Sequence, residues 1–169
     1  SLVNLPIDCP IVLIGSKSEA TYTSALFDLI SEQAQGKVLN VSGKTSLREL
    51  INIIAHSKMM ISNDTGPMHI AFATHTPTVA LFGPSKPEQF AWFLNGIYHY
   101  KQIYCSPCVH EFQIPPCKGN NQCMKQIPVS EVLQSVQNVL DNKFEKVLPI
   151  LPAILDDLEG NPLGLISRP

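Results

Sequence analysis

The first two-thirds of the chain alternate short, uniformly apolar runs with longer segments in which apolar residues recur every three or four positions. The run Ile11–Ile14 is apolar throughout and ends at Gly15, which is typical of a parallel strand buried on both faces. Apolar residues then recur at helical spacing over Ala25–Ile30, and we expect Gly36 to end this helix. A brief strand is predicted at Val38–Val41.

The same order of elements then repeats. Ser46 and Glu49 have the spacing of a capping box, as Ser16 and Glu19 do before the first helix. The further elements are predicted as a helix over 47–57, a strand over 59–62, a helix over 68–74 and a strand over 78–82. Strands that alternate with helices at this spacing predict an α/β fold, a Rossmann-like parallel sheet flanked by helices.

The pattern weakens after Gly83. A strand is predicted over 96–104, a cysteine-rich loop over 105–123, and an amphipathic helix over 129–140 that begins at Ser130. The last residues are rich in proline and glycine, which is typical of a tail. We therefore expect one domain over 1–142 and a proline-rich tail over 143–169.

Composition narrows the class of protein. Hydrophobic residues make up 44% of the 169 positions and charged residues 15%, which excludes a disordered chain and an ordinary coiled coil. A formal net charge of −2 gives no sign of the positively charged surface that nucleic-acid binding requires. No apolar run approaches the ~18–20 residues of a membrane span, and no signal peptide opens the sequence. These features predict a soluble, cytosolic protein.

Ligands of open parallel sheets bind at the carboxyl ends of the strands. Three turns lie at such ends, Gly15–Glu19, Asn63–His69 and Gly83–Lys86. The second turn opens a helix, where backbone N–H groups and the positive end of the helix dipole attract anions.

Within that turn, three residues suit a diphosphate without any metal or other cofactor. Gly66 allows a phosphate close to the backbone, the Thr65 hydroxyl can donate a hydrogen bond, and His69 lies on the same side of the first helical turn. The alternative is structural: Asp64 or Thr65 caps the helix and His69 packs in the core.

The sequence Ser62-Asn63-Asp64-Thr65-Gly66-Pro67-Met68-His69-Ile70-Ala71, followed by Pro77-Thr78-Val79-Ala80-Leu81-Phe82-Gly83-Pro84, resembles the C-terminal half of family 9 glycosyltransferases. These are ADP-heptose:lipopolysaccharide heptosyltransferases and their relatives. Gly43-Lys44-Thr45-Ser46-Leu47 and the Cys-x-Pro-Cys run ending in Cys123-Met124 also match. The resemblance covers roughly 11–140 and implies a GT-B enzyme, in which two Rossmann-like domains face each other across a cleft.

The resemblance also implies roles for single residues. Asp64, Thr65, Gly66 and His69 match the motif that contacts the diphosphate and the sugar, with His69 as the catalytic residue. Glu19 matches a carboxylate that binds the ribose hydroxyls, although its place in a capping box is an equally good explanation. Thr45 would border the adenine, with Leu47 as an apolar wall. Lys17 is close enough in sequence to reach a phosphate, but a solvated lysine is the simpler interpretation.

Family members are about twice as long as this chain, so the N-terminal acceptor domain, with its catalytic Asp and its site for a lipid-linked acceptor, is expected outside this sequence. So are the opening strand of the nucleotide-binding domain and its phosphate-contacting loop. The resemblance thus predicts inverting transfer of heptose from ADP-heptose or a related nucleotide sugar to the lipopolysaccharide inner core, and no turnover by this chain alone. It places the enzyme in the cytoplasm, with peripheral association at the inner membrane left open.

The cysteines support a different hypothesis. Cys105, Cys108, Cys117 and Cys123 have the spacing Cys-x2-Cys-x8-Cys-x5-Cys, with His110 nearby. A Cys-x2-Cys pair is half of many tetrahedral zinc sites. The alternative function is therefore a non-catalytic binding or interaction module with a zinc-stabilised loop, unless the four thiols are simply reduced and partly buried.

Overall fold

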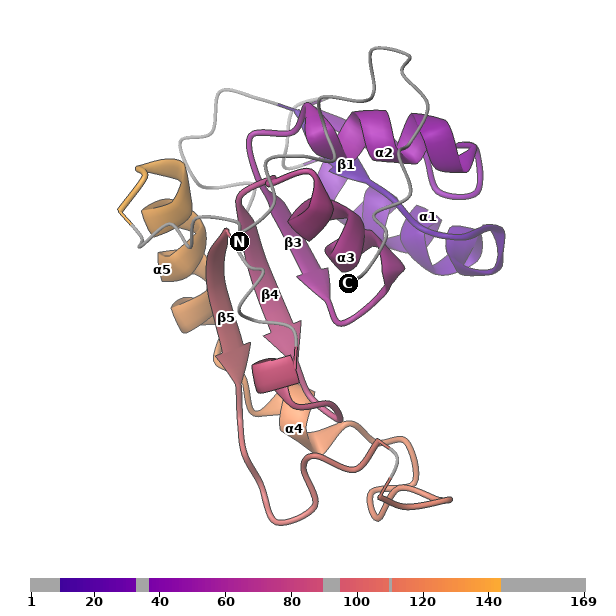
Figure 1. The fold of residues 1–169 in the computed structure, drawn as a ribbon. Coiled ribbons are helices and arrows are strands. Elements are labelled where there is room, and N and C mark those ends of the chain that lie inside the picture. Colours follow the sequence, from indigo (N-terminus) through magenta and orange to yellow (C-terminus); the bar gives the residue numbers. More distant parts are fainter. Residues whose placement is uncertain (1–9, 33–36, 90–94, 110, 144–169) are drawn as a thin grey trace, which may run out of the picture.

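The computed structural model describes residues 10–32, 37–89, 95–109 and 111–143. The strands and helices are β1 (Ile11–Leu13), α1 (Ala20–Ser31), β2 (Val38–Asn40), α2 (Leu47–Ala55), β3 (Met60–Asn63), α3 (Gly66–Ala73), β4 (Thr78–Phe82), β5 (Gly96–Tyr100), α4 (Gln122–Lys125) and α5 (Val129–Leu140). Short 3-10 turns cover Lys17–Glu19 and Pro87–Gln89. The predicted alternation of strands and helices is confirmed (Figure 1).

All strand pairs are parallel, as predicted, but the described strands form two hydrogen-bonded sheets. In one sheet β1 pairs with β2, and Ile11 lies opposite Val38. In the other, β4 lies between β3 and β5, and Thr78 is opposite Met60 on one side and Gly96 on the other. The carboxyl ends of β3 and β4 therefore share one edge, which places the turns after these strands next to each other.

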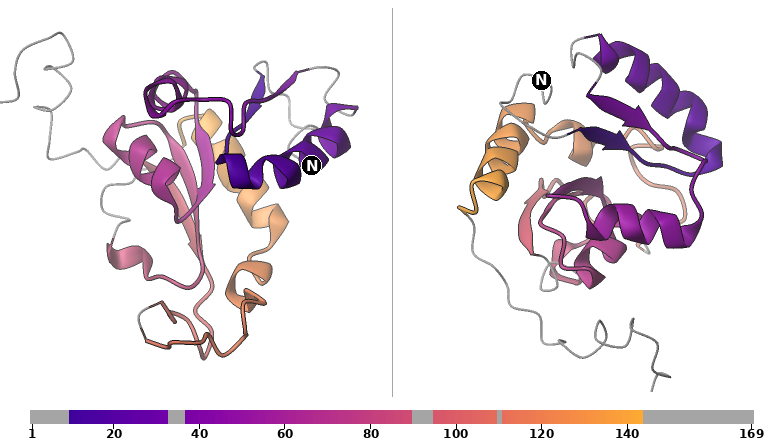
Figure 2. Two further views of the ribbon diagram at one scale, coloured as in Figure 1. Left: turned by 90° about the vertical axis from the view of Figure 1, so that its right-hand side faces the viewer. Right: turned by 90° about the horizontal axis from the view of Figure 1, so that it is seen from above.

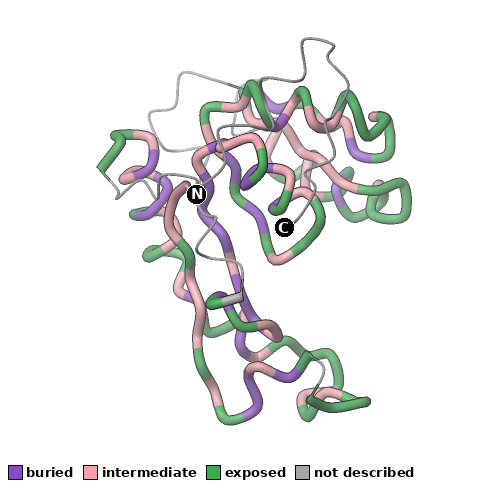
Figure 3. Tube along the Cα trace, viewed as in Figure 1, coloured by how far each residue is buried: buried purple, intermediate pink, exposed green. Residues whose placement is uncertain are grey.

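β4 forms the centre of the larger sheet, and Val79, Ala80 and Phe82 are fully buried (Figure 3). Ala80 and Phe82 pack against Met68 and Phe72 of α3. Val79, which faces the other way, packs against Val136 and Val139 of α5. The sheet is thus covered on both faces (Figure 2), which explains why its central strand is apolar at successive positions.

Several element bounds differ from the predictions. α3 begins at Gly66 rather than Met68, because Pro67 lies in the first helical turn, where its fixed φ suits a helix. β5 ends at Tyr100 rather than at residue 104, since Tyr100 lies opposite Phe82, the last residue of β4. The range of α5, Val129–Leu140, is confirmed, but its N-cap is Pro128 and Ser130 does not begin it. The short helix α4 has no clear signature in the sequence.

Gly36, His110 and the predicted tail beyond residue 143 lie outside the described residues, so the proposed division at residue 142 stays a prediction. No helix in the described part of the chain is both long and apolar enough to cross a membrane.

Candidate functional site

The turn between β3 and α3 presents the beginning of a helix at the carboxyl edge of the sheet. Thr65 is the N-cap in an extended conformation, with φ −148° and ψ 170°, but its side chain makes no capping bond. The hydroxyl donates instead to the Asn63 carbonyl, 3.3 Å away. The Met68 and His69 amides point back to the Thr65 carbonyl at 3.0 and 3.4 Å. Side-chain capping by Thr65 is therefore wrong as an explanation of this motif.

Asp64 joins two residues from different turns. One carboxylate oxygen, Oδ1, lies 3.5 Å from Nε2 of His69. The other, Oδ2, accepts a hydrogen bond from the Ser85 hydroxyl in the turn after β4. Asp64 is 21% exposed, whereas His69 is 44% exposed and meets Phe72 only edge to face. The imidazole thus lies at the surface beside a carboxylate, and the alternative that places it in the core is wrong.

Gly66 leaves open space beside this histidine. Apart from its chain neighbours and the backbone of its own helix, a Cβ built at Gly66 would have no heavy atom within 4 Å. The space beside Gly66 is therefore not filled by side chains, although this turn lines neither of two cavities found elsewhere in the described residues. An open helix N-terminus with a histidine beside it suits an anionic ligand that approaches along the sheet edge.

Glu19 lies at the carboxyl end of β1, where it closes the predicted capping box. The Ser16 amide and hydroxyl both donate to Oε2 of Glu19, at 2.7 and 2.6 Å. The hydrogen bond from the Ser16 side chain, followed by that from its backbone, lowers the pKa of this exposed carboxyl. Both bonds converge on one oxygen, so the structural role still leaves Oε1 to bind a ligand. The two explanations of Glu19 are compatible.

The turn after β2 lies against the turn after β1. The Gly43 amide donates to the Gly15 carbonyl at 2.9 Å, and Gly43 has a φ of +69°. A Cβ on Gly43 would lie 2.9 Å from the Lys17 Cα atom, so this close approach needs glycine. Thr45 follows as a half-buried residue and Leu47 is 67% exposed.

The predicted site residues thus form two groups. Glu19 and Thr45 lie at the ends of β1 and β2, whereas Asp64, Thr65, Gly66 and His69 lie at the beginning of α3. Ile14, which follows β1, links the two groups, because it packs against the buried cluster of Ile54, Met60 and Ala71, which are residues of α2, β3 and α3.

Ser85 is a site residue that sequence reasoning missed. The Gly83–Lys86 turn was a candidate, but nothing in the sequence pairs Ser85 with a carboxylate 21 positions earlier. The cysteine loop supports this turn, because the Cys108 and Val109 amides donate to the Pro84 carbonyl at 2.8 and 3.0 Å. Gly83 is confined by the same segment, because a Cβ added there would lie 2.6 Å from Sδ of Met124 and 3.1 Å from Sγ of Cys123.

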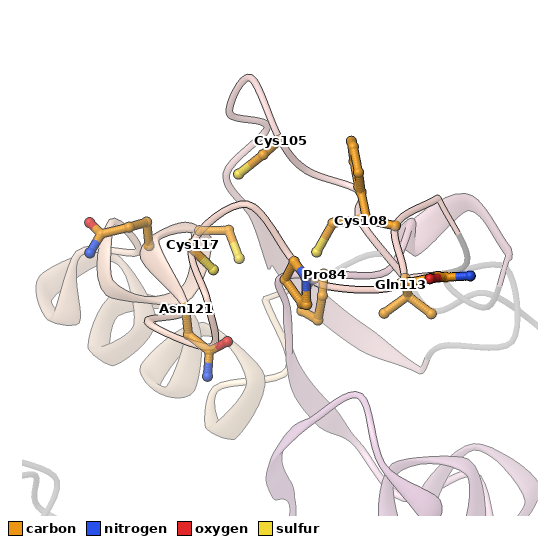
Figure 4. Close-up of a pocket in the computed structure, with 11 residues that line it drawn as sticks. Pro84, Cys105, Cys108, Gln113, Cys117 and Asn121 are labelled. Atoms are coloured by element: carbon orange, nitrogen blue, oxygen red, sulfur yellow. The ribbon is translucent and has the colours of Figure 1, made fainter.

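The four cysteines of this loop line a cavity of about 280 Å³ together with Pro84 (Figure 4). Cys105, Cys108 and Cys123 are buried and Cys117 is half-buried, all as free thiols. Within the described ranges, no three histidine, cysteine or acidic side chains are placed to hold a metal ion. The described residues therefore add no support to the alternative of a zinc-stabilised loop, and Cys108 and Cys123 lie against the Gly83–Ser85 turn.

The thiols differ in their expected reactivity. Burial raises the pKa of Cys108 and of Cys123. Burial also raises the pKa of Cys117, but backbone hydrogen bonds from the 119–122 amides outweigh it and lower the pKa overall. Since the thiolate is the nucleophile, iodoacetamide at pH 7.5 should alkylate Cys117 several-fold faster than Cys108 or Cys123. Peptide mass spectrometry measures the alkylation rate of each thiol. In the denatured chain, the difference between the rates should disappear. Faster labelling of either buried thiol would contradict the arrangement.

The fold and the turns together define a Rossmann-like α/β domain with its candidate ligand site at the carboxyl edge of a parallel sheet. A scan against family models matches residues 6–118 to glycosyltransferase family 9 (heptosyltransferase). Lipooligosaccharide heptosyltransferase 2 of Campylobacter jejuni serotype O:2 is 32% identical over 136 residues, which cover 78% of this chain and 41% of that protein. Lipopolysaccharide heptosyltransferase 2 of Escherichia coli is 35% identical over 78 residues, 46% of this chain and 22% of that protein.

A solved structure, that of E. coli ADP-heptose lps heptosyltransferase II, matches with a TM-score of 0.66 and 25% identity, over 84% of this chain and 40% of that one. This chain belongs to the family 9 glycosyltransferases, the heptosyltransferase family. It spans about two-fifths of the length of the C. jejuni relative.

Proposed function

We propose that this chain binds the nucleotide-sugar donor, ADP-heptose, in an enzyme that transfers heptose to the inner core of lipopolysaccharide. The observation that carries the proposal is the arrangement at the open beginning of α3, where Asp64 contacts both His69 and Ser85 beside the unfilled space at Gly66. The family and the names of its members support the choice of donor.

The chemistry assigned to this edge is stabilisation of the leaving group. An acceptor hydroxyl, deprotonated by a carboxylate of another domain, attacks the anomeric carbon of the heptose. The bond from that carbon to the diphosphate oxygen breaks, and its electron pair leaves with the ADP. His69, oriented by Asp64, and the helix end then stabilise the negative charge that develops on the diphosphate. Glu19 binds the ribose through its second oxygen, and Thr45 borders the base.

The acceptor site and the base belong, in this proposal, to a domain outside this sequence, since the chain spans 41% of the C. jejuni relative. We therefore expect the 169-residue chain to bind donor without transferring sugar. Titration with ADP-, UDP- and GDP-sugars tests this directly. Preference for the ADP-sugar supports the proposal, and binding to none of them would favour a non-catalytic interaction module instead.

Gly66→Ala tests the position of the diphosphate. We expect the affinity for ADP-heptose to fall about tenfold, or roughly 1.4 kcal/mol, because the added methyl group takes the space assigned to a phosphate. The thermal unfolding midpoint should stay the same, because no atom lies within 4 Å of the new methyl position. Unchanged affinity, measured by calorimetry, would place the diphosphate elsewhere.

A further inference from the structure

Four thiols of the cysteine-rich loop share one cavity that the proposed donor chemistry does not use. Cys105, Cys108, Cys117 and Cys123 all line the cavity of about 280 Å³, and all four are free thiols. Figure 4 shows Cys105, Cys108 and Cys117 around this space. We call it the thiol cavity. It is many times larger than the space that one water molecule needs, so a molecule as small as hydrogen peroxide fits inside it.

Cys117 differs from the other three thiols in its surroundings. It is half-buried, whereas Cys105, Cys108 and Cys123 are buried, so a reagent that arrives from solvent meets Cys117 first. Burial acts to raise the pKa of Cys117, but hydrogen bonds from the amides of residues 119–122 outweigh it and lower the pKa overall. An accessible, stabilised thiolate with further thiols beside it is the arrangement of redox-sensing cysteines.

Two of the buried thiols lie where they can react with an oxidised Cys117. Cys108 and Cys123 line the same cavity. Burial is the largest cause of the raised pKa of each, but the charge of Cys117 also contributes to both, which places the three sulfur atoms near one another. A thiol next to a sulfenic acid condenses with it to a disulfide.

We propose that Cys117 is an oxidation site for hydroperoxides, and that Cys108 or Cys123 closes a disulfide with it inside the thiol cavity. The Cys117 thiolate attacks one oxygen of hydrogen peroxide and the O–O bond breaks. Cys117 becomes a sulfenic acid, and the hydroxide that leaves takes up a proton to form water. The sulfur of the second thiol then attacks the Cys117 sulfur, the S–O bond breaks, and the hydroxyl leaves with the thiol proton as a second water. The peroxide is reduced and the two thiols are oxidised.

Both candidate partners of Cys117 lie against the turn that carries Ser85. The Cys108 amide donates to the Pro84 carbonyl at 2.8 Å. On the other side, a Cβ added to Gly83 would lie 3.1 Å from Sγ of Cys123. A new covalent bond at either thiol therefore acts on a segment that is packed directly against this turn.

Oxidation is thus expected to reach the donor site, a consequence that rests on the proposed function. Ser85 donates to one oxygen of Asp64, and the other oxygen lies 3.5 Å from Nε2 of His69. Displacement of the turn weakens the hydrogen bond from Ser85. We expect the oxidised chain to bind ADP-heptose about fivefold more weakly, the scale of one lost hydrogen bond, and to recover on reduction with dithiothreitol.

The test treats the reduced 169-residue chain with a small excess of hydrogen peroxide at neutral pH. Remaining thiols are blocked with iodoacetamide, and disulfide-linked peptides are mapped by mass spectrometry. Cys117→Ser removes the reactive thiol. Cys9→Ser is the matched control, because it makes the same substitution at the one cysteine of the sequence outside the loop. The unsubstituted chain unfolded in urea is a second control, which needs no variant to fold.

We expect a disulfide between Cys117 and Cys108 or Cys123 in the unsubstituted chain and in Cys9→Ser, reversed by dithiothreitol. In Cys117→Ser, oxidation of the loop should be about tenfold slower, because only thiols with little thiolate remain. A disulfide that omits Cys117, irreversible oxidation of Cys117 without a disulfide, or the same rate and pairing in the urea-unfolded chain would overturn the proposal.

ADP-heptose affinity of the oxidised and reduced chains is the second readout. A Cys117 disulfide with unchanged affinity would uphold the oxidation site and overturn its link to the donor site. Failure of the proposed function shows differently, as absence of ADP-sugar binding already in the reduced chain. The peptide map decides the oxidation site in either case.

Discussion

His69→Asn is expected to lower the rate of heptose transfer by about 10- to 1,000-fold, the scale of losing one preorganised donor at a developing negative charge. The imidazole is surface-exposed, held by Asp64 at 3.5 Å, and next to the open helix end. Asparagine has no atom where Nε2 lies, so the variant loses the ring and its contact with Asp64. The assay needs a two-domain enzyme, in which this chain replaces the corresponding part of a heptosyltransferase 2 relative and transfer from ADP-heptose is followed.

His75→Asn is the matched control for this variant. His75 follows the far end of α3 and has a φ of +56°, a left-handed conformation that asparagine tolerates well. The same change of side chain should therefore leave transfer close to that of the unsubstituted enzyme. Equal rates for His69→Asn and His75→Asn would contradict the role assigned to His69. A loss confined to donor affinity, with an unchanged maximal rate, would make His69 a binding residue only.

Gly96→Ala should destabilise the fold by about 3 kcal/mol or more, through backbone strain and overpacking. Gly96 begins β5 with a φ of +156°, and a Cβ there would lie 1.8 Å from the carbonyl oxygen of Thr78. That oxygen belongs to the backbone of β4, so the clash is relieved only if β5 separates from the central strand. Such a loss is a large part of the 5–15 kcal/mol that stabilises a typical domain.

Urea unfolding measures this effect as a lower midpoint at a constant slope. Gly66→Ala is the control, because it adds the same methyl group where no atom lies within 4 Å, and its midpoint should match that of the unsubstituted chain. If Gly96→Ala also unfolds at the same midpoint, β5 does not pair with β4 in the register that places Gly96 opposite Thr78.

The sequence was sufficient for the centre of the fold. The run Thr78–Phe82 was predicted residue for residue, because a strand buried on both faces must be apolar at nearly every position. Edges of elements were less predictable. β5 can continue over residues 101–104 only if β4 is long enough to pair with them. The length of β4 cannot be predicted from the sequence of β5 itself.

The candidate site shows the same division between local and long-range information. The turn with Asp64, Gly66 and His69 was predicted because a strand, a glycine and a proline place a helix N-terminus there. The hydrogen bond from Ser85 to Asp64 was not predicted. It joins side chains 21 residues apart in the sequence, which come together only because β3 pairs with β4. Nor did the spacing of the cysteines reveal that their loop holds the turn that carries Ser85.

The sequence by itself determined the order of the strands and the longer helices, the apolar centre of the sheet and the residues at each turn, because these depend on backbone preferences and hydrophobic periodicity over a few residues. The tertiary structure alone decided that Asp64 contacts both His69 and Ser85, that the cysteines line a cavity without metal geometry in the described residues, and that β1 and β3 enclose an apolar cavity. Each of these features brings together residues that are far apart in the chain. The distances between such residues are set by packing between helices and strands, which no short stretch of sequence encodes.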